Sequence, residues 1–214
     1  MTPELQSVRT RQICALAPVI PVLVVHDPDR AEPLARSLVA GGLPVLEVTL
    51  RTPAALTVIS RMAGIAGSVV GAGTVLTPDD VKRAKDAGAA FAVAPGATDR
   101  LIRACVDEAL PLLPGAATAS EVMRAFEYGF DMLKFFPAEV AGGVPALKAL
   151  GAPLPHISFC PTGGVSAANA SEYLALANVV CVGGSWITPD KDVSAENWAA
   201  IQTRASQAAA LRVS

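Results

Sequence analysis

The chain has 214 residues, of which 52% are hydrophobic, 17% charged and 5% aromatic, and its net charge is −2. This length and apolar content suffice for one complete core, so we predict a single domain over residues 1–214. The near-neutral charge, with no block of basic residues, excludes a typical nucleic-acid-binding surface.

The sequence also argues against a membrane span. The uncharged segment at residues 62–78 is interrupted by four glycines, and a span needs about 20 continuous apolar residues. Residues 1–11 mix acidic and basic side chains and lack the apolar core of a signal peptide. We therefore expect a cytoplasmic protein.

Residues 1–18 are predicted to form an extra N-terminal helix. Beyond them, short runs of Val, Ile and Leu recur at near-constant spacing and predict buried parallel strands. Segments with helical periodicity lie between these runs, and a closing helix is predicted over residues 195–211. The predicted strands begin near Val19, Pro44, Ser68, Ala90, Pro111, Asp131, Ile157 and Val179.

Eight strand–helix units predict an α/β fold, a single-domain (β/α)8 TIM barrel spanning residues 19–189 with the extra helix before it. Helix starts are signalled by Thr77-Pro78 and by a capping box at Thr118 and Glu121. An open doubly wound sheet is the alternative. It usually has a glycine-rich first turn, whereas the first predicted strand here ends in the sequence Val-His-Asp-Pro.

Lys134 stands out because it lies in an apolar strand-like run, residues 131–137, whereas the other lysines lie on polar helix faces or in charged loops. An ammonium group buried without a partner tends to lose its proton. A neutral amine can attack a ketone and form a Schiff base. The alternative is a lysine whose stem packs while its ammonium group reaches solvent.

Glu47 is the second candidate catalytic residue. It alternates with Leu46 and Val48, so it should point into the barrel while they face the helices. By the same alternation Lys134 lies opposite Leu133, and the two charged side chains could meet across the interior. A purely structural buried ion pair is the alternative, although such pairs often add little stability.

Glycine pairs follow the last two predicted strands, at Gly163-Gly164 and Gly183-Gly184. Backbone amides at such positions bind anions, and the loops after strands seven and eight are the usual phosphate site of this barrel. The pairs predict a phosphorylated substrate, with tight turns as the alternative reading. The two histidines of the chain are too few for a histidine-rich catalytic metal site, so no metal is expected.

The motifs around these residues resemble the 2-keto-3-deoxy-6-phosphogluconate (KDPG) aldolase and 4-hydroxy-2-oxoglutarate (KHG) aldolase family. The resemblance runs from about residue 19 to residue 189 and rests on motifs at residues 46–52, 71–76, 134–139, 160–165 and 182–186. It implies a metal-independent Schiff-base aldolase that cleaves KDPG to pyruvate and glyceraldehyde 3-phosphate, without a cofactor. It also implies a homotrimer.

The same resemblance implies roles for individual residues. Lys134 would form the Schiff base and Glu47 would be the general acid and base. Arg51 would grip the pyruvate carboxylate with Thr74 beside it, and the pyruvate pocket would be lined by Pro95 and Phe136. The hydroxyl and phosphate end would be held by Thr162, Gly163, Gly164, Gly184 and Ser185.

Other functions remain open at this level. A phosphosugar isomerase or epimerase on the same barrel would use Glu47 as base and Lys134 as a charged helper. A non-catalytic phosphosugar-binding module would not need both side chains. If the chain is an aldolase, the galactonate epimer of KDPG and KHG are alternative substrates.

Overall fold

A computed structural model describes residues 1–211 of the chain. The strands are β1 (Val19–Leu23), β2 (Val45–Thr49), β3 (Val69–Gly73), β4 (Phe91–Val93), β5 (Leu112–Leu113), β6 (Gly115–Ala116), β7 (Met132–Phe135), β8 (Ser158–Pro161) and β9 (Val182–Gly184). The helices are α1 (Pro3–Cys14), α2 (Ala31–Ala40), α3 (Ala55–Ala63), α4 (Pro78–Asp86), α5 (Asp99–Asp107), α6 (Ala119–Glu127), α7 (Gly143–Gly151), α8 (Ala170–Leu174), α9 (Asp190–Ser194) and α10 (Trp198–Ala209), with a 3-10 turn at Pro28–Arg30.

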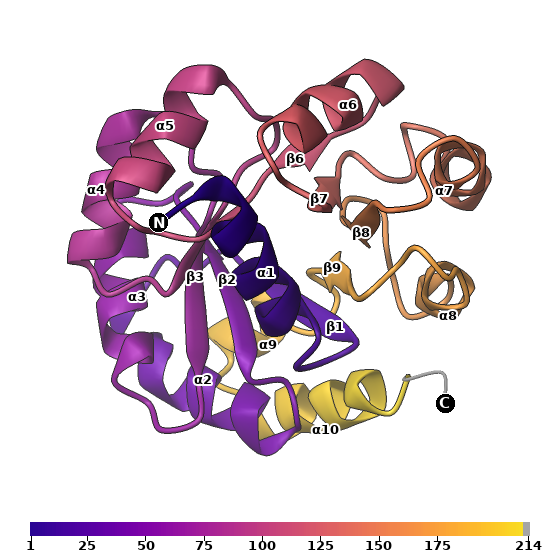
Figure 1. Ribbon diagram of the computed structural model, residues 1–214. Helices are drawn as coiled ribbons and strands as arrows, with labels where there is room; N and C mark the ends of the chain where they lie inside the picture. Colours follow the sequence, from indigo (N-terminus) through magenta and orange to yellow (C-terminus); the bar gives the residue numbers. More distant parts are fainter. Residues whose placement is uncertain (212–214) are drawn as a thin grey trace.

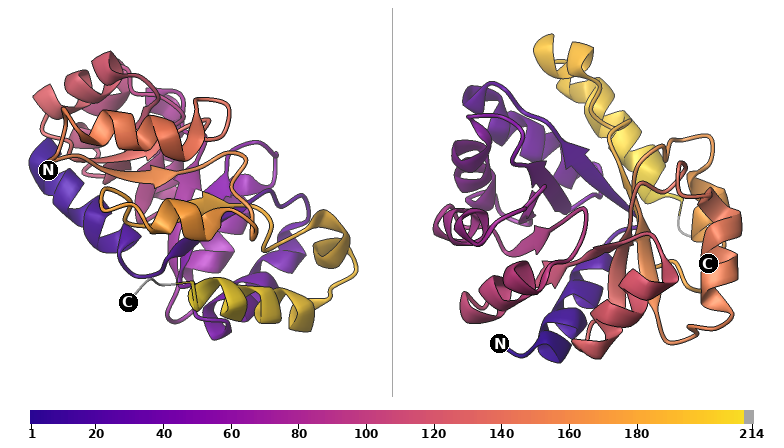
Figure 2. Two further views of the ribbon diagram at one scale, coloured as in Figure 1. Left: turned by 90° about the vertical axis from the view of Figure 1, so that its right-hand side faces the viewer. Right: turned by 90° about the horizontal axis from the view of Figure 1, so that it is seen from above.

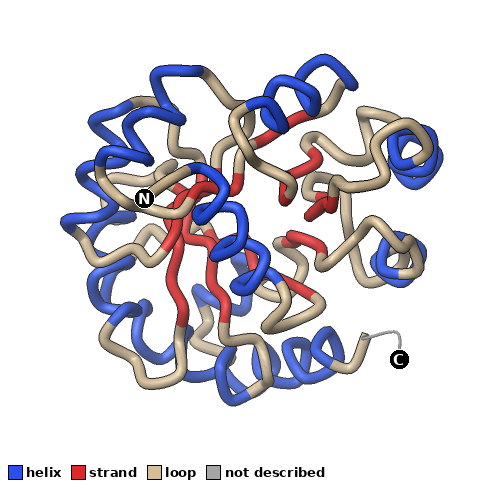
Figure 3. Tube along the Cα trace, in the orientation of Figure 1, coloured by secondary structure: helices blue, strands red, loops and turns tan. Residues whose placement is uncertain are grey.

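The strands are parallel and the helices lie outside them, which confirms the predicted α/β class. The strands curl around a common interior as a half-barrel (Figures 1 and 3). Their pairing divides into one sheet of order β5-β4-β3-β2-β1-β9 and another of order β6-β7-β8. The fifth predicted strand is split at Pro114, because proline has no N–H group to give to a strand ladder.

The predicted element boundaries hold at most positions. The N-terminal helix is shorter than predicted, at Pro3–Cys14, and the last strand begins at Val182 rather than near Val179. The closing helix is present but shorter than the predicted 195–211, because α10 spans Trp198–Ala209, and a short helix, α9, precedes it. Both views in Figure 2 show α10 as a separate helix at the edge of the molecule, where it contacts α2. The predicted domain extends over residues 212–214, which lie outside the described residues.

Capping explains where several helices begin. Thr118 accepts from the Glu121 N–H, and the Glu121 side chain accepts from the Thr118 N–H, as the sequence predicts for a capping box. A second capping box at Thr77 and Asp80 starts α4. These two caps fix the ends of the loops that lead from β3 to α4 and from β6 to α6.

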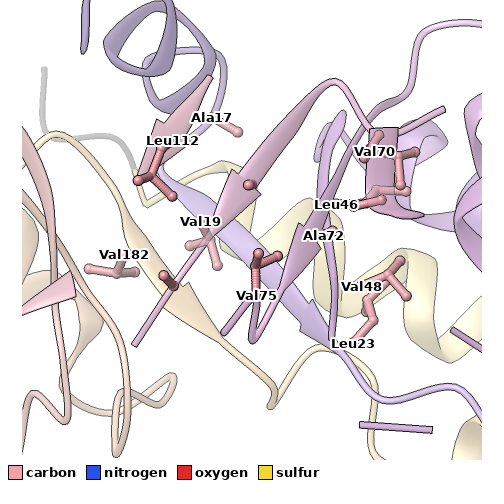
Figure 4. Packing of buried hydrophobic residues seen from close by; sticks show 14 of the residues in the cluster. Ala17, Val19, Leu23, Leu46, Val48, Val70, Ala72, Val75, Leu112 and Val182 are labelled. Atoms are coloured by element: carbon pink, nitrogen blue, oxygen red, sulfur yellow. The ribbon is translucent and has the colours of Figure 1, made fainter. Parts of the chain in front are cut away.

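Two clusters of buried side chains lie on opposite faces of the strands. The larger cluster joins strands to helices and includes Leu46, Val48 and Leu133; Figure 4 shows part of it. The smaller includes Val45 and Met132, which alternate with those residues along β2 and β7. The alternation predicted for these two strands is therefore confirmed.

The smaller cluster also holds thiols. Cys14, Cys160 and Cys181 belong to it, and all are free and buried. Hydrogen bonds with Cys14 and Cys160, together with burial, raise the pKa of the Cys181 thiol well above its ordinary value. The Cys181 thiol therefore remains protonated at neutral pH, as expected for a structural cysteine in a core.

Helix α1 crosses in front of the strands in Figure 1 and contacts β5 and β7. Its Ser7 is buried, donates to Asp131 Oδ1 at 2.6 Å, and accepts from the N–H groups of Asp131 and Met132 at 2.9 and 3.1 Å. Thr10 donates to the Leu112 carbonyl at 3.1 Å. One serine thus satisfies two N–H groups at the start of β7 that would otherwise lack a partner.

We expect Ser7→Ala to lower the free energy of unfolding by about 1–3 kcal/mol, because it leaves the two N–H groups without an acceptor. Urea denaturation followed by circular dichroism measures the change. Ser206→Ala is the matched control, since that exposed serine donates only to a carbonyl of its own helix. Equal stability of the two variants would show that α1 is not anchored through Ser7.

Candidate active site

The site is built around an ion pair between two strands. Lys134 Nζ on β7 donates to Glu47 Oε1 on β2 at 3.1 Å, and the two side chains are 7% and 4% exposed. The two residues meet as strand alternation predicts. Removing either partner would leave a buried charge uncompensated, so each side chain holds the other in place.

Glycine leaves the room that Glu47 needs. A Cβ atom at Gly73 on β3 would lie 2.4 Å from Glu47 Oε1 and 2.7 Å from its Cγ. Glu47 therefore packs directly against the backbone of the neighbouring strand. The position and conformation of this carboxylate depend on the absence of a side chain at Gly73.

A cavity of about 190 Å³ opens at the carboxyl ends of the strands next to this pair. Lys134 Nζ lies 5.4 Å from the centre of the Phe136 ring, and that ring lines the cavity. The full lining is Val22, Arg51, Phe136, Thr162, Gly163, Gly164, Val165, Gly183, Gly184 and Ser185. Seven residues predicted for substrate binding are therefore brought together here: Arg51, Phe136, Thr162, Gly163, Gly164, Gly184 and Ser185.

Arg51 is the only cationic residue in this lining. It is exposed, and within residues 1–211 no carboxylate lies at ion-pair distance from its guanidinium. A guanidinium without a protein partner can form two parallel hydrogen bonds with a ligand carboxylate. Arg51 thus provides an anion site at one side of the cavity.

The other side of the cavity is glycine-rich. Gly163 and Gly164 have φ values of +100° and +80°, which L side chains rarely adopt. No hydrogen bond joins the N–H of Gly164 or of Ser185 to another part of residues 1–211. Free amides in such a turn can receive the oxygens of an anion.

Two predicted binding residues lie elsewhere on the same edge. Thr74 and Pro95 follow β3 and β4, and neither lines the cavity. Thr74 has a φ of +59°, an uncommon conformation for threonine that places strain at the end of β3. Pro95 is held close to β6, since a Cβ atom at Gly115 would lie 2.2 Å from its carbonyl oxygen.

Three lining residues were not predicted: Val22, Val165 and Gly183. Val22 pairs with Glu47 across the β1–β2 ladder, so register would have placed it beside the site. Val165 and Gly183 are direct neighbours of predicted residues. No group of three or more His, Cys, Asp or Glu side chains within residues 1–211 could hold a metal ion, and no helix there could cross a membrane.

Comparison with known proteins finds relatives over most of the chain. Residues 10–204 match the family model described as Aldolase: KDPG and KHG aldolase. A 2-dehydro-3-deoxy-phosphogluconate aldolase of Pseudoalteromonas atlantica is 48% identical over 95% of this chain and 95% of its own length.

Two solved structures are similar throughout. KDPG aldolase from Legionella pneumophila, with pyruvate captured as a covalent carbinolamine intermediate, has a TM-score of 0.91 at 44% identity over 93% of this chain and 97% of its own. The aldolase of Zymomonas mobilis with 3-phosphoglycerate has a TM-score of 0.89 at 47% identity, covering 94% and 95% of the two chains.

The parallel α/β fold and these relatives define an aldolase, that is, a carbon–carbon lyase. The chain belongs to the KDPG and KHG aldolase family.

Gly73→Ala should lower aldol cleavage at least about 10-fold, because the new Cβ atom displaces Glu47 and small misplacements at a reacting centre are costly. A coupled assay for released pyruvate measures the rate. Gly64→Ala is the control, since its Cβ atom would make only an ordinary contact, 3.5 Å from the Arg61 carbonyl oxygen. If Gly73→Ala retained the wild-type rate while folded, the placement of Glu47 would not limit turnover.

Proposed function

We propose that the chain is a Schiff-base aldolase that cleaves KDPG to pyruvate and glyceraldehyde 3-phosphate. The observation that carries the proposal is the buried Lys134–Glu47 pair beside a cavity with an anion site at each side. The similarity to KDPG aldolases over nearly the whole chain supports the substrate.

In this proposal Lys134 is the nucleophile. Glu47 accepts a proton from the ammonium group at 3.1 Å, and the neutral amine attacks C2 of the keto acid. Loss of water from the carbinolamine gives an iminium, which withdraws electrons from the C3–C4 bond. A covalent carbinolamine with pyruvate in the Legionella pneumophila enzyme supports this step.

Glu47 is the general acid and base. It gives a proton to the leaving water and then takes the proton of the C4 hydroxyl as the C3–C4 bond breaks. The aldehyde product is glyceraldehyde 3-phosphate, and the bond electrons remain in an enamine on Lys134. Protonation and hydrolysis of the enamine release pyruvate and return the free amine.

We place the pyruvate half at Arg51, whose guanidinium grips the carboxylate, with Thr74, Pro95 and Phe136 around it. The phosphate end lies on the turn at Gly163 and Gly164, and the remaining polar contacts come from Thr162, Gly184 and Ser185. The phosphorylated ligand of the Zymomonas mobilis enzyme supports a phosphate site. The carboxylate of KHG could occupy the same end, and the family description includes KHG.

Further parts of the proposal concern the fold and the assembly. We propose that residues 1–214 form one domain and that the two sheets close into an eight-stranded barrel with α1 as an extra helix. Bridges from Phe159 to Val179 and from Thr162 to Gly183 support closure. We also propose that the protein is a cytoplasmic homotrimer that needs neither cofactor nor metal.

Two alternatives lack such support. An isomerase would need no reducible imine on Lys134, and the relatives described above are aldolases. The galactonate epimer differs from KDPG only at C4, so the same Schiff-base chemistry would serve it. Measured C4 selectivity separates the epimer from KDPG.

Borohydride reduction with pyruvate should attach one reduced pyruvate to Lys134, because reduction makes an imine permanent. Intact mass and peptide mapping locate the adduct. Lys134→Ala should lose both adduct and turnover, whereas the control Lys148→Ala, which removes an exposed amine on α7, should keep both. An adduct at another lysine, or none in folded protein, would overturn the assignment.

Glu47→Gln should still form the adduct, more slowly, and lose roughly 10²–10⁴-fold in turnover because it removes the proton carrier. Single-turnover kinetics separate imine formation from C–C cleavage. Glu108→Gln is the matched control, since it changes the surface pair that Glu108 makes with Lys85 at 3.0 Å. Unchanged turnover in folded Glu47→Gln would exclude Glu47 as the proton carrier.

A further inference from the structure

The turn at Gly163 and Gly164 rests on Glu139, a residue of the connection between β7 and α7. The Glu139 N–H donates to the Gly163 carbonyl at 3.0 Å. A Cβ atom at Gly164 would lie 2.4 Å from Glu139 Cγ and 2.6 Å from its Cβ. Glu139 therefore supports the turn through both its backbone and its side chain.

The far end of the Glu139 side chain is fixed by Tyr173 of α8. The tyrosine hydroxyl donates to Glu139 Oε1, and the tyrosine is fully buried. Burial and the hydrogen bond to Glu139 raise the pKa of Tyr173 well above its ordinary value. The hydroxyl therefore remains a donor throughout the physiological pH range, and the carboxylate is held toward α8.

The opposite side of the turn is fixed as well. Asn169 Nδ2 donates to the Gly164 carbonyl at 3.2 Å, and Asn169 Oδ1 accepts from the Ser166 N–H at 2.8 Å. Both carbonyls of the turn are thus bonded on the protein side. Among residues 1–211, the three atoms nearest to a Cβ atom at Gly164 all belong to Glu139, whose carboxylate is anchored by the buried Tyr173.

We propose that Glu139 and Tyr173 are positioning residues that set the Gly163–Gly164 turn for the phosphate group of the substrate. The proposal rests on the assignment of the phosphate to that turn. It gives a role to the Glu139 carboxylate and to the buried Tyr173, which contact neither Lys134 nor Glu47. Backbone donors cannot follow a displaced ligand as a flexible lysine could, so their support decides how well they bind.

Tyr173→Phe tests the proposal, because it removes the hydroxyl and keeps the ring in the core. We expect KM for KDPG to rise roughly 10-fold, as for the loss of a hydrogen bond to a charged group. We expect kcat for KDPG, cleavage of unphosphorylated 2-keto-3-deoxygluconate and borohydride trapping of pyruvate to stay within about twofold of wild type.

Glu139→Leu, which removes the acceptor, should match Tyr173→Phe, and Glu139→Gln, which retains an acceptor oxygen, should restore most of the affinity. Tyr128→Phe is the matched control, since it removes a tyrosine–carboxylate hydrogen bond to Asp99 on the surface. Tyr128→Phe should change the kinetic constants for neither KDPG nor 2-keto-3-deoxygluconate.

Equal losses on both substrates in Tyr173→Phe, with a lower Tm, would overturn the positioning role and leave a structural one. The phosphate assignment would still stand in that case, provided that wild type prefers the phosphorylated substrate. If wild type shows no such preference, the phosphate assignment and the positioning role both fail. Trapping of pyruvate on Lys134 would still test the Schiff-base proposal independently.

Discussion

The buried pair between Lys134 and Glu47 is the constraint on which the rest of the site depends. The partners lie 87 positions apart, on β2 and β7, so only the folded arrangement of strands brings them together. Removing two charges from water costs several kcal/mol per ion, which the pair offsets only with good geometry. Because the pair is neutral as a whole, a proton can pass between its members without changing the net charge of the interior.

Close approach of backbone to side chains is the second feature of the site. The absence of a side chain leaves room for Glu47 beside Gly73, for the Pro95 backbone beside Gly115, and for Glu139 beside Gly164. At each position a Cβ atom would fall within 2.4 Å of a neighbouring atom, so even alanine requires movement. The placement of Glu47 and the shape of the Gly163–Gly164 turn thus both depend on a glycine that packs against a glutamate side chain.

The sequence predicted the parts of this arrangement that follow from local pattern. Apolar runs located the strands, capping residues located the starts of α4 and α6, and the alternation along β2 and β7 placed Glu47 with Lys134. It did not predict the division at Pro114, although a proline within a strand run signals such a break, because the apolar pattern continues across it. The start of the closing helix at Trp198, rather than at residue 195, was also missed, because no apolar period marks that boundary. The Glu139–Tyr173 contact was also missed, since it joins residues 34 positions apart whose proximity no spacing rule supplies.

The distribution of charge around the cavity separates the two ends of the substrate. Arg51 is the only cation in the lining, and no carboxylate of residues 1–211 lies at ion-pair distance from it, so it can serve the carboxylate of the keto acid. The glycine-rich side offers no cationic side chain, only amides, hydroxyls and the dipoles behind them. Amide donors act only over hydrogen-bond distance. Affinity at that end must therefore come from a turn held in place before the ligand arrives, which is the arrangement that Glu139, Tyr173 and Asn169 provide.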